Sequence, residues 1–181
     1  MTLLQACDLA EFAWNISDVW DQKTDTHVAF KQDGTTLYVC FRGSEFADAY
    51  DSVEDRIEAK ISEVNPLTVV YVGHSLGAIL AVLGSIASLL RGRRSPAFGI
   101  GCPRGISFFS VLKIRRAMSG LITWWRNDQD VITHLAPKLF WATHIGKKVQ
   151  VGKWWRFWTA ILPNGNNAHM LSQYRKNGGV N

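Results

Sequence analysis

The segment Gly73-His74-Ser75-Leu76-Gly77 has the residue types and the spacing of a site for nucleophilic catalysis. A serine with a glycine two residues away on each side is typical of the sharp turn that joins a strand to a helix and exposes the serine hydroxyl. Glycine suits both flanking positions because a side chain there would collide with the tightly turned backbone. Ser75 is therefore a candidate nucleophile for acyl transfer.

A nucleophilic serine needs a base that takes its proton and an acid that orients the base. On a sheet of this kind the chain order is Ser, then Asp or Glu, then His. Only two acidic residues follow Ser75, namely Asp128 and Asp130. Both come directly after an apolar run that predicts a strand over Leu121–Trp125, and functional groups gather where such strands end. Asp130 is the favoured acid, and Asp128 is the alternative.

Three histidines follow the two aspartates: His134, His144 and His169. His134 is only four residues beyond Asp130 and would compete with it for the same loop. His144 lies in a β-like run, where a packed ring is the ordinary interpretation. His169 lies in a polar segment that enters the last predicted helix, from which a side chain can reach the site. We therefore predict that His169 is the base.

Acyl transfer also needs donors for the negative charge that develops on the substrate oxygen. One donor in such sites is the backbone amide of the residue after the nucleophile, here Leu76. The second comes from a loop after an earlier strand. Ser44 follows the β-rich run that ends at Phe41, and it could offer both its amide and its hydroxyl. Leu76 and Ser44 are therefore the predicted oxyanion donors.

The elements that position these residues alternate between strand and helix. Apolar spacing and turn signals predict helices over 2–20, 48–63, 76–90, 106–118 and 168–176, strands over 67–72, 97–100 and 121–125, a hairpin around Asp33-Gly34, and a second hairpin of 140–144 and 148–151 around Gly146. Such alternation is typical of a mostly parallel sheet with helices on both faces.

Length and composition favour one compact domain spanning residues 1–181, with 47% hydrophobic and 19% charged residues. The three cysteines have no metal-binding spacing, and we interpret them as small buried side chains in a reduced interior. We expect no signal peptide and a cytoplasmic location. The charge-free stretch 66–90 is interrupted by Gly73-His74-Ser75, so we interpret it as a strand, a turn and a buried helix rather than a membrane span.

Charge is distributed unevenly along the chain. Residues 1–90 contain 5 Lys and Arg against 13 Asp and Glu, whereas residues 91–181 contain 15 against 2. This asymmetry suggests a surface that meets an anionic partner. Aromatic and basic residues alternate in one strip, and this mixture suits peripheral contact with an anionic membrane. The residues of this strip are Lys153, Trp154, Trp155, Arg156 and Trp158. An alternative interpretation is a basic protein that binds nucleic acid or a membrane on a non-catalytic fold.

Several segments, taken in order along the chain, resemble the class 3 lipases, the family of the fungal triacylglycerol lipases and several plant phospholipases A1. They are Phe41-Arg42-Gly43-Ser44, the segment 70–78 around Ser75, Phe98-Gly99-Ile100-Gly101-Cys102-Pro103-Arg104, the segment 130–137 that begins at Asp130, and His169 with Tyr174. The chain departs from the family pattern at Ala78 and Gln129. It also departs in the His-to-Tyr spacing, which is five residues rather than three.

The resemblance implies an α/β-hydrolase fold and a serine carboxylic-ester hydrolase, a lipase, esterase or phospholipase A1, that acts on acylglycerol or phospholipid esters. It implies Ser75, Asp130 and His169 as the triad, Ser44 and Leu76 as the oxyanion hole, and no metal or organic cofactor. The secreted fungal members carry a lid helix between the segments that correspond to Ser44 and Ser75. That stretch is short here, so we expect a minimal lid or none. Thioester cleavage or transfer to another acceptor would use the same groups.

Overall fold

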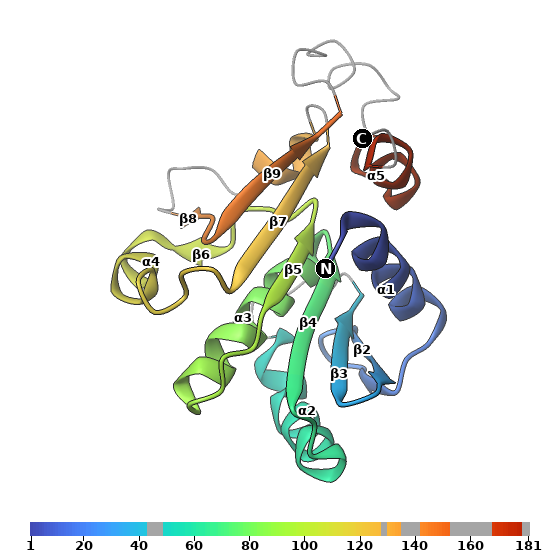
Figure 1. Cartoon of the computed structure of the whole chain (residues 1–181), viewed down its shortest axis with the longest axis vertical. Coiled ribbons are helices and arrows are strands. Elements are labelled where there is room, and N and C mark those ends of the chain that lie inside the picture. The colour runs from blue at the N-terminus through green and yellow to red at the C-terminus, as the bar shows by residue number, and fades with distance from the viewer. Residues whose placement is uncertain (43–48, 128–129, 135–141, 153–167, 179–181) are drawn as a thin grey trace.

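Apolar side chains point to both faces of the central strands, so the sheet has to be covered on both sides. Leu37, Val39 and Phe41 contribute to one buried cluster, whereas Tyr38 and Cys40, which alternate with them, contribute to another. The computed structural model describes residues 1–42, 49–127, 130–134, 142–152 and 168–178. In this part of the chain, helices pack against both faces of one sheet (Figure 1).

The main sheet has seven strands in the order β1-β2-β3-β4-β5-β7-β9. The pairs β1–β2 and β2–β3 are antiparallel, and the strands from β3 to β9 are parallel. This confirms the predicted mostly parallel sheet flanked by helices. The strands are β1 (Val19–Asp21), β2 (Thr26–Asp33), β3 (Thr36–Phe41), β4 (Thr68–His74), β5 (Ala97–Ile100), β6 (Ile106–Ser107), β7 (Ile122–Asn127), β8 (Ala142–Thr143) and β9 (Lys147–Val151).

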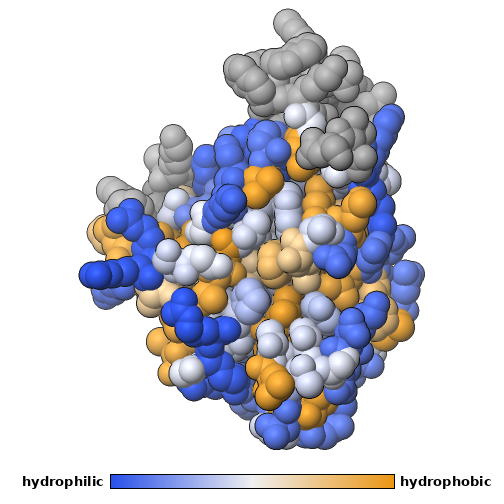
Figure 2. All heavy atoms as spheres, viewed as in Figure 1, coloured by the Kyte–Doolittle hydropathy of each residue, from blue (hydrophilic) through white to orange (hydrophobic). Residues whose placement is uncertain are grey.

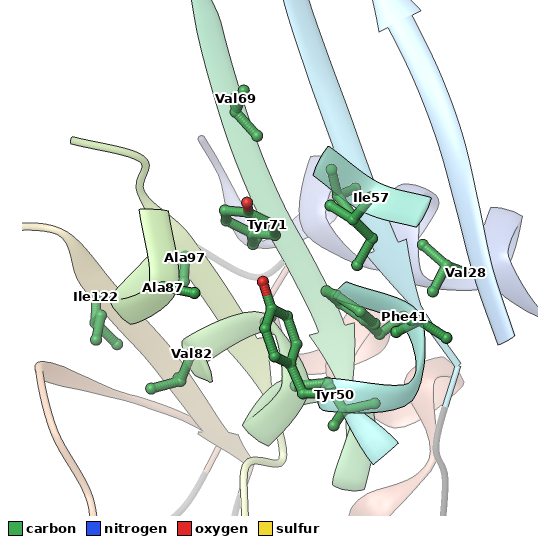
Figure 3. Close-up of a cluster of buried hydrophobic side chains, with 14 of the residues drawn as sticks. Val28, Phe41, Tyr50, Ile57, Val69, Tyr71, Val82, Ala87, Ala97 and Ile122 are labelled. Atoms are coloured by element: carbon green, nitrogen blue, oxygen red, sulfur yellow. The ribbon is translucent and has the colours of Figure 1, made fainter. Parts of the chain in front are cut away.

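Two helices, α2 (Asp51–Val64) and α3 (Leu76–Leu90), cover one face of the sheet. The apolar stripe of α2 is formed by Val53, Ile57 and Ile61, which are all buried. Figure 3 shows part of this cluster, in which Tyr71 projects from β4. The ring centroid of Phe41 lies 6.2 Å from that of Tyr50 and 6.3 Å from that of Tyr71. The helix α4 (Phe108–Ile114) also contributes a buried side chain, Val111, to this cluster.

The opposite face is covered by α1 (Leu3–Asn15) and α5 (Leu171–Gly178), which contact each other. The buried side of α1 includes Leu3, Cys7 and Leu9, and α5 contributes Tyr174. Thr2 and Gln5 form a reciprocal pair of capping hydrogen bonds at the start of α1. A space-filling view from this side shows hydrophobic and hydrophilic residues interspersed (Figure 2).

The predicted helix over 2–20 is too long. The helix α1 ends at Asn15, and Val19–Asp21 forms the edge strand β1, which pairs with β2. Ile16 and Trp20 lie at apolar positions with helical spacing in the sequence, but they are 43% and 53% exposed. The Trp20 ring stacks on His27 of β2 with ring centroids 5.8 Å apart. Pairing at the sheet edge therefore prevails over the apolar spacing.

The hairpin predicted around Gly146 is wrong, whereas the one at Asp33-Gly34 is confirmed by the pairing of β2 with β3. The strand β8 pairs with β6 in a separate two-stranded sheet, and β9 pairs in parallel with β7. Gly146, at φ +94°, passes so close to β7 that a Cβ there would lie 2.5 Å from the carbonyl oxygen of Ile122. The chain turns there to reach the open edge of the main sheet, instead of folding back on itself.

All three cysteines are unpaired and buried, as predicted. Burial raises the pKa of each thiol to about 12, so each is a neutral apolar group at neutral pH. Within the described ranges no helix has both the length and the apolar composition needed to cross a bilayer.

Candidate active site

Ser75 lies between β4 and α3 in a strained backbone conformation, with φ 58° and ψ −129°. Non-glycine residues rarely adopt positive φ, and strain of this kind is concentrated at functional sites. The Ser75 amide donates a hydrogen bond of 2.9 Å to the carbonyl oxygen of Ile100, at the end of β5. Ser75 is half-buried. The strand, the sharp turn and the helix are the context that the sequence motif requires.

Both glycines of the motif are needed for close backbone contact. A Cβ at Gly73 would lie 2.1 Å from the carbonyl oxygen of Gly77, and a Cβ at Gly77 would lie 2.6 Å from that of Phe41. Both distances are far shorter than van der Waals contact. The turn that holds Ser75 therefore packs against itself and against the end of β3.

The amide of Leu76 lies at the first position of α3. The first four amides of a helix have no partner within the helix, and they form its positive end. The first turn of α3 contains no acidic residue that would compete for them. The amide next to Ser75 is therefore suited to a developing negative charge. Ser44, the second predicted donor, lies outside the described residues.

Asp130 is completely buried, and its carboxylate accepts three hydrogen bonds. The Ile132 amide donates to Oδ1 at 3.0 Å, while His169 Nδ1 and the Tyr174 hydroxyl donate to Oδ2 at 2.8 and 2.7 Å. The Asp130 backbone is also held, because its amide donates to the carbonyl of Asn127 at 2.9 Å. The alternative acid, Asp128, lies outside the described residues.

The hydrogen bond to Asp130 determines which nitrogen of His169 can act as a base. A carboxylate only accepts, so Nδ1 carries the proton and Nε2 of the neutral ring keeps a lone pair. The side chain of His169 is 16% exposed. Among the described residues the Ser75 hydroxyl forms no hydrogen bond. Asp130 and His169 are thus in direct contact, and Ser75 follows His74, whose ring lies 4.7 Å from that of His169.

Tyr174 reaches Asp130 from α5, although its spacing from His169 departs from the family pattern. Burial raises the pKa of Tyr174 well above its ordinary value, so the hydroxyl stays protonated and donates. Gly101, at φ +59°, contacts the same pair of residues. A Cβ there would lie 2.8 Å from His169 Cε1 and 3.0 Å from Asp130 Oδ2.

Two buried side chains that sequence reasoning missed hold the backbone around His169. Nε2 of His74 donates to the carbonyl oxygen of His169 at 2.7 Å, and Nδ2 of Asn127 donates to that of Ala168 at 2.9 Å. The rings of His74 and His169 lie 4.7 Å apart. Burial chiefly, and also the charge of His169, lower the pKa of His74 to about 4. The motif marks His74 only as a variable position.

The other two candidate histidines have different partners. The ring of His144 stacks on Trp124, with centroids 4.0 Å apart, and its Nε2 donates to the carbonyl of Cys102 at 2.9 Å. It is a packed residue, as expected. Nδ1 of His134 accepts a hydrogen bond of 3.3 Å from Arg104. Burial lowers the pKa of both rings.

A basic group, Arg126, lies near the carboxylate of Asp130. Arg126 is the residue before Asn127 at the end of β7, and the charge of Asp130 acts on it. Burial is nevertheless the largest influence on Arg126, and it lowers the pKa of the guanidinium.

Within the described residues, no group of three or more His, Cys, Asp or Glu side chains could hold a metal ion. The aromatic and basic strip 153–158 lies outside the described residues.

The sequence model for lipase (class 3) matches residues 9–140. Lipase II from Rhizopus niveus superposes with a TM-score of 0.66 at 17% identity, over 85% of this chain and 82% of that one. The triacylglyceride lipase of Rhizomucor miehei superposes with a TM-score of 0.68 at 18% identity, over 82% of this chain and 78% of that one. A third structure is a triacylglycerol lipase described as having a serine protease triad at its catalytic centre. It superposes with a TM-score of 0.59 at 19% identity, over 70% of this chain and 62% of that one. The chain matches no curated protein sequence.

The solved structures share the α/β-hydrolase fold with this chain, and at these identities they show the fold alone. The family model covers well over half of the 181 residues. With its mostly parallel sheet and its strained serine turn, the chain belongs to the class 3 lipase family of carboxylic-ester hydrolases.

Proposed function

We propose that the protein hydrolyses lipid esters through a triad of Ser75, His169 and Asp130. The observation that carries the proposal is the hydrogen bond of 2.8 Å between His169 Nδ1 and the buried Asp130 carboxylate. It leaves Nε2 as the basic nitrogen, and His74, the residue before Ser75 in the strained turn, contacts His169. A triad at the catalytic centre of a structurally similar triacylglycerol lipase is consistent with this assignment.

In the first half of the reaction, Nε2 of His169 takes the proton of the Ser75 hydroxyl as its oxygen attacks the ester carbonyl. The carbonyl oxygen becomes negative and accepts hydrogen bonds from the Leu76 amide and, as the sequence predicts, from Ser44. The imidazolium then gives its proton to the leaving alcohol, and an acyl-enzyme remains.

In the second half, His169 takes a proton from water as the water oxygen attacks the acyl carbonyl. The imidazolium then returns this proton to the Ser75 oxygen as the carboxylic acid leaves. Asp130 stays ionised throughout. Its carboxylate holds the imidazole in the required tautomer and stabilises the imidazolium that forms twice per turnover.

The substrate class that we propose is an ester of a lipid, either an acylglycerol or a phospholipid. A phospholipase must also accommodate the anionic phosphate of its substrate, and Arg126 supplies positive charge near Asp130. Initial rates on emulsified triacylglycerol, phosphatidylglycerol vesicles and a soluble p-nitrophenyl ester distinguish lipase, phospholipase and esterase activity. Contact of the strip 153–158 with an anionic membrane stays a prediction.

The proposal predicts that Ser75→Ala lowers kcat on a soluble p-nitrophenyl ester by about 10⁴-fold or more, because no other group attacks the carbonyl. A fluorophosphonate probe should label the native protein and leave this variant unlabelled. Ser110→Ala, an exposed serine of α4, is the control and should keep full activity. Substantial turnover in Ser75→Ala would refute the triad and favour the non-catalytic alternative.

A further inference from the structure

Two consecutive carbonyl groups, those of Ala168 and His169, accept hydrogen bonds from buried side chains at the ends of two strands. The donors are Asn127 of β7 and His74 of β4, at 2.9 and 2.7 Å. Asn127 is itself oriented by Asn177 of α5, whose amide nitrogen donates to its Oδ1 at 2.6 Å. Asn127 is completely buried and His74 is 8% exposed. The segment that carries His169 is therefore fixed directly to the carboxyl ends of two strands of the sheet.

Fixing this backbone matters because the hydrogen bond to Asp130 alone cannot determine where Nε2 of His169 points. An imidazole bonded through Nδ1 can still pivot about that bond if its Cα moves. Displacing a reacting group by about 1 Å can cost about 100-fold in rate. The hydrogen bond to the carbonyl of residue 169 restrains the Cα from which the ring projects. Together the two hydrogen bonds define the position of the base.

The chemical state of His74 suits this role. A carbonyl oxygen only accepts, so Nε2 of His74 carries the proton. With its pKa lowered to about 4, the ring is neutral at neutral pH. A neutral ring 4.7 Å from His169 adds no repulsion when the latter becomes an imidazolium. The edge of the Tyr174 ring, with its centroid 6.5 Å away, completes the packing around His74.

We propose that His74 is a positioning residue for the reaction, whose Nε2–H hydrogen bond to the His169 carbonyl holds the imidazole in line between Asp130 and Ser75. The inference rests on the proposed function, since it assigns His74 a part in the same proton transfer. His74 does not touch the reacting atoms, and it acts only through the backbone of His169.

The test compares His74→Gln with His74→Asn. The amide nitrogen of Gln is separated from Cβ by the same number of bonds as Nε2 of His, so it can donate to the His169 carbonyl. The amide of Asn is one methylene shorter and cannot reach. On a soluble p-nitrophenyl ester at pH 7.5, kcat of His74→Asn should fall about 100-fold with KM nearly unchanged, because positioning rather than binding is lost. His74→Gln should recover most of that loss.

His74→Phe provides a second comparison if His74→Asn fails to fold, since it keeps the ring volume and lacks the donor. Urea unfolding of each variant separates positioning from folding, because a structural role alone would make kcat follow stability. An equal loss of kcat in His74→Gln and His74→Asn overturns the inference, and so does full activity in both His74→Asn and His74→Phe.

The Ser75→Ala variant separates this inference from the proposed function. If Ser75→Ala stays active, the proposed function fails, and the role of His74 fails with it. If Ser75→Ala is inactive and unlabelled by the fluorophosphonate probe while the His74 variants do not differ from one another, the triad stands and only the inference on His74 fails.

Discussion

Gly101 contacts both the acid and the base of the proposed triad, and no side chain fits at its position. Its φ of +59° is unfavourable for other residues, and a Cβ would lie within 3.0 Å of both His169 and Asp130. Glycine is thus required here for two reasons: the backbone has a positive φ, and there is no space for a side chain. These two requirements can be separated by experiment.

We predict that Gly101→Ala lowers kcat by about 10- to 100-fold, because the new methyl group displaces His169 from Asp130. Gly120→Ala is the matched control, since Gly120 has φ +77° and open space around its Cβ position. Both variants should lose about 1 kcal/mol of stability from backbone strain. Urea unfolding and steady-state kinetics measure the two effects. Equal kcat values for the two variants would contradict this role for Gly101.

The residues that the sequence proposed for the site are those with distinctive chemistry. Ser75 is marked by its motif, and acids are so scarce after it that Asp130 had one competitor. His74, Asn127 and Gly101 were missed for a physical reason. Their roles depend on distances to residues 29 to 95 positions away in the chain, and no local pattern records such distances. Tyr174 was noted only as a loose match in spacing.

At the scale of elements, α5 contacts both the helix α1 and the carboxylate of Asp130. Arg175 forms ion pairs with Asp8 and Glu11 of α1, and the neighbouring Tyr174 donates its hydroxyl to Asp130. Figure 1 shows α5 beside α1 on the same side of the sheet. The docking of this helix on α1 therefore places a buried donor against the carboxylate of Asp130.

We predict that Tyr174→Phe destabilises the protein by about 2 kcal/mol, since a hydrogen bond to a charged group is lost. It should also lower kcat about tenfold, because one of the donors that orient Asp130 is removed. Tyr71→Phe is the matched control. The buried Tyr71 hydroxyl is hydrogen-bonded to Ser88 at 2.8 Å, in the cluster on the α2 and α3 face of the sheet.

In the control, stability should fall while kcat stays at the native value. Thermal unfolding and kinetics on a soluble ester measure both quantities. If kcat fell equally in the two variants, the hydroxyl of Tyr174 would have no specific part in orienting Asp130.

Helices and strands were predicted well where the pattern of apolar residues reflects burial on a continuous face. The helix Leu76–Leu90 and the strand Ala97–Ile100 have the predicted bounds. The errors lie where partners far along the chain decide the structure. Val19–Asp21 becomes a strand because β2 offers an edge, and Lys147–Val151 joins β7 instead of its neighbour in sequence.

For the whole molecule, the buried His74 makes stability depend on pH. Its pKa is about 4 in the folded protein, against about 6.5 for a histidine in an unfolded chain. Burial is the main cause, followed by the charge of His169, which is opposed by the hydrogen bond to the His169 carbonyl and the charge of Asp130. Between these pKa values the unfolded chain binds a proton that the folded chain does not, so acid favours unfolding.

We predict that the stabilising contribution of neutral His74 is complete above about pH 6.5 and is lost as the pH falls toward 4. At pH 5 the loss should be about 2 kcal/mol relative to neutral pH. Urea unfolding at pH 7.5 and pH 5 measures it, with His74→Gln as the comparison, since this variant should lose about 2 kcal/mol less. His144, whose pKa is also lowered, acts in the same direction in both proteins. Equal losses in the two proteins would contradict the prediction.

By itself, the sequence determined the fold class, a candidate nucleophile and a short set of candidates for acid and base, because apolar periodicity and motif spacing are local properties of the chain. Only the tertiary structure decided that Asp130 and His169 pair, that Tyr174 joins them, and that His74 and Asn127 hold the backbone of the proposed base. Those contacts form where the ends of β4, β5 and β7 converge with α5, and their geometry follows from sheet register and helix docking, which are properties of the folded chain.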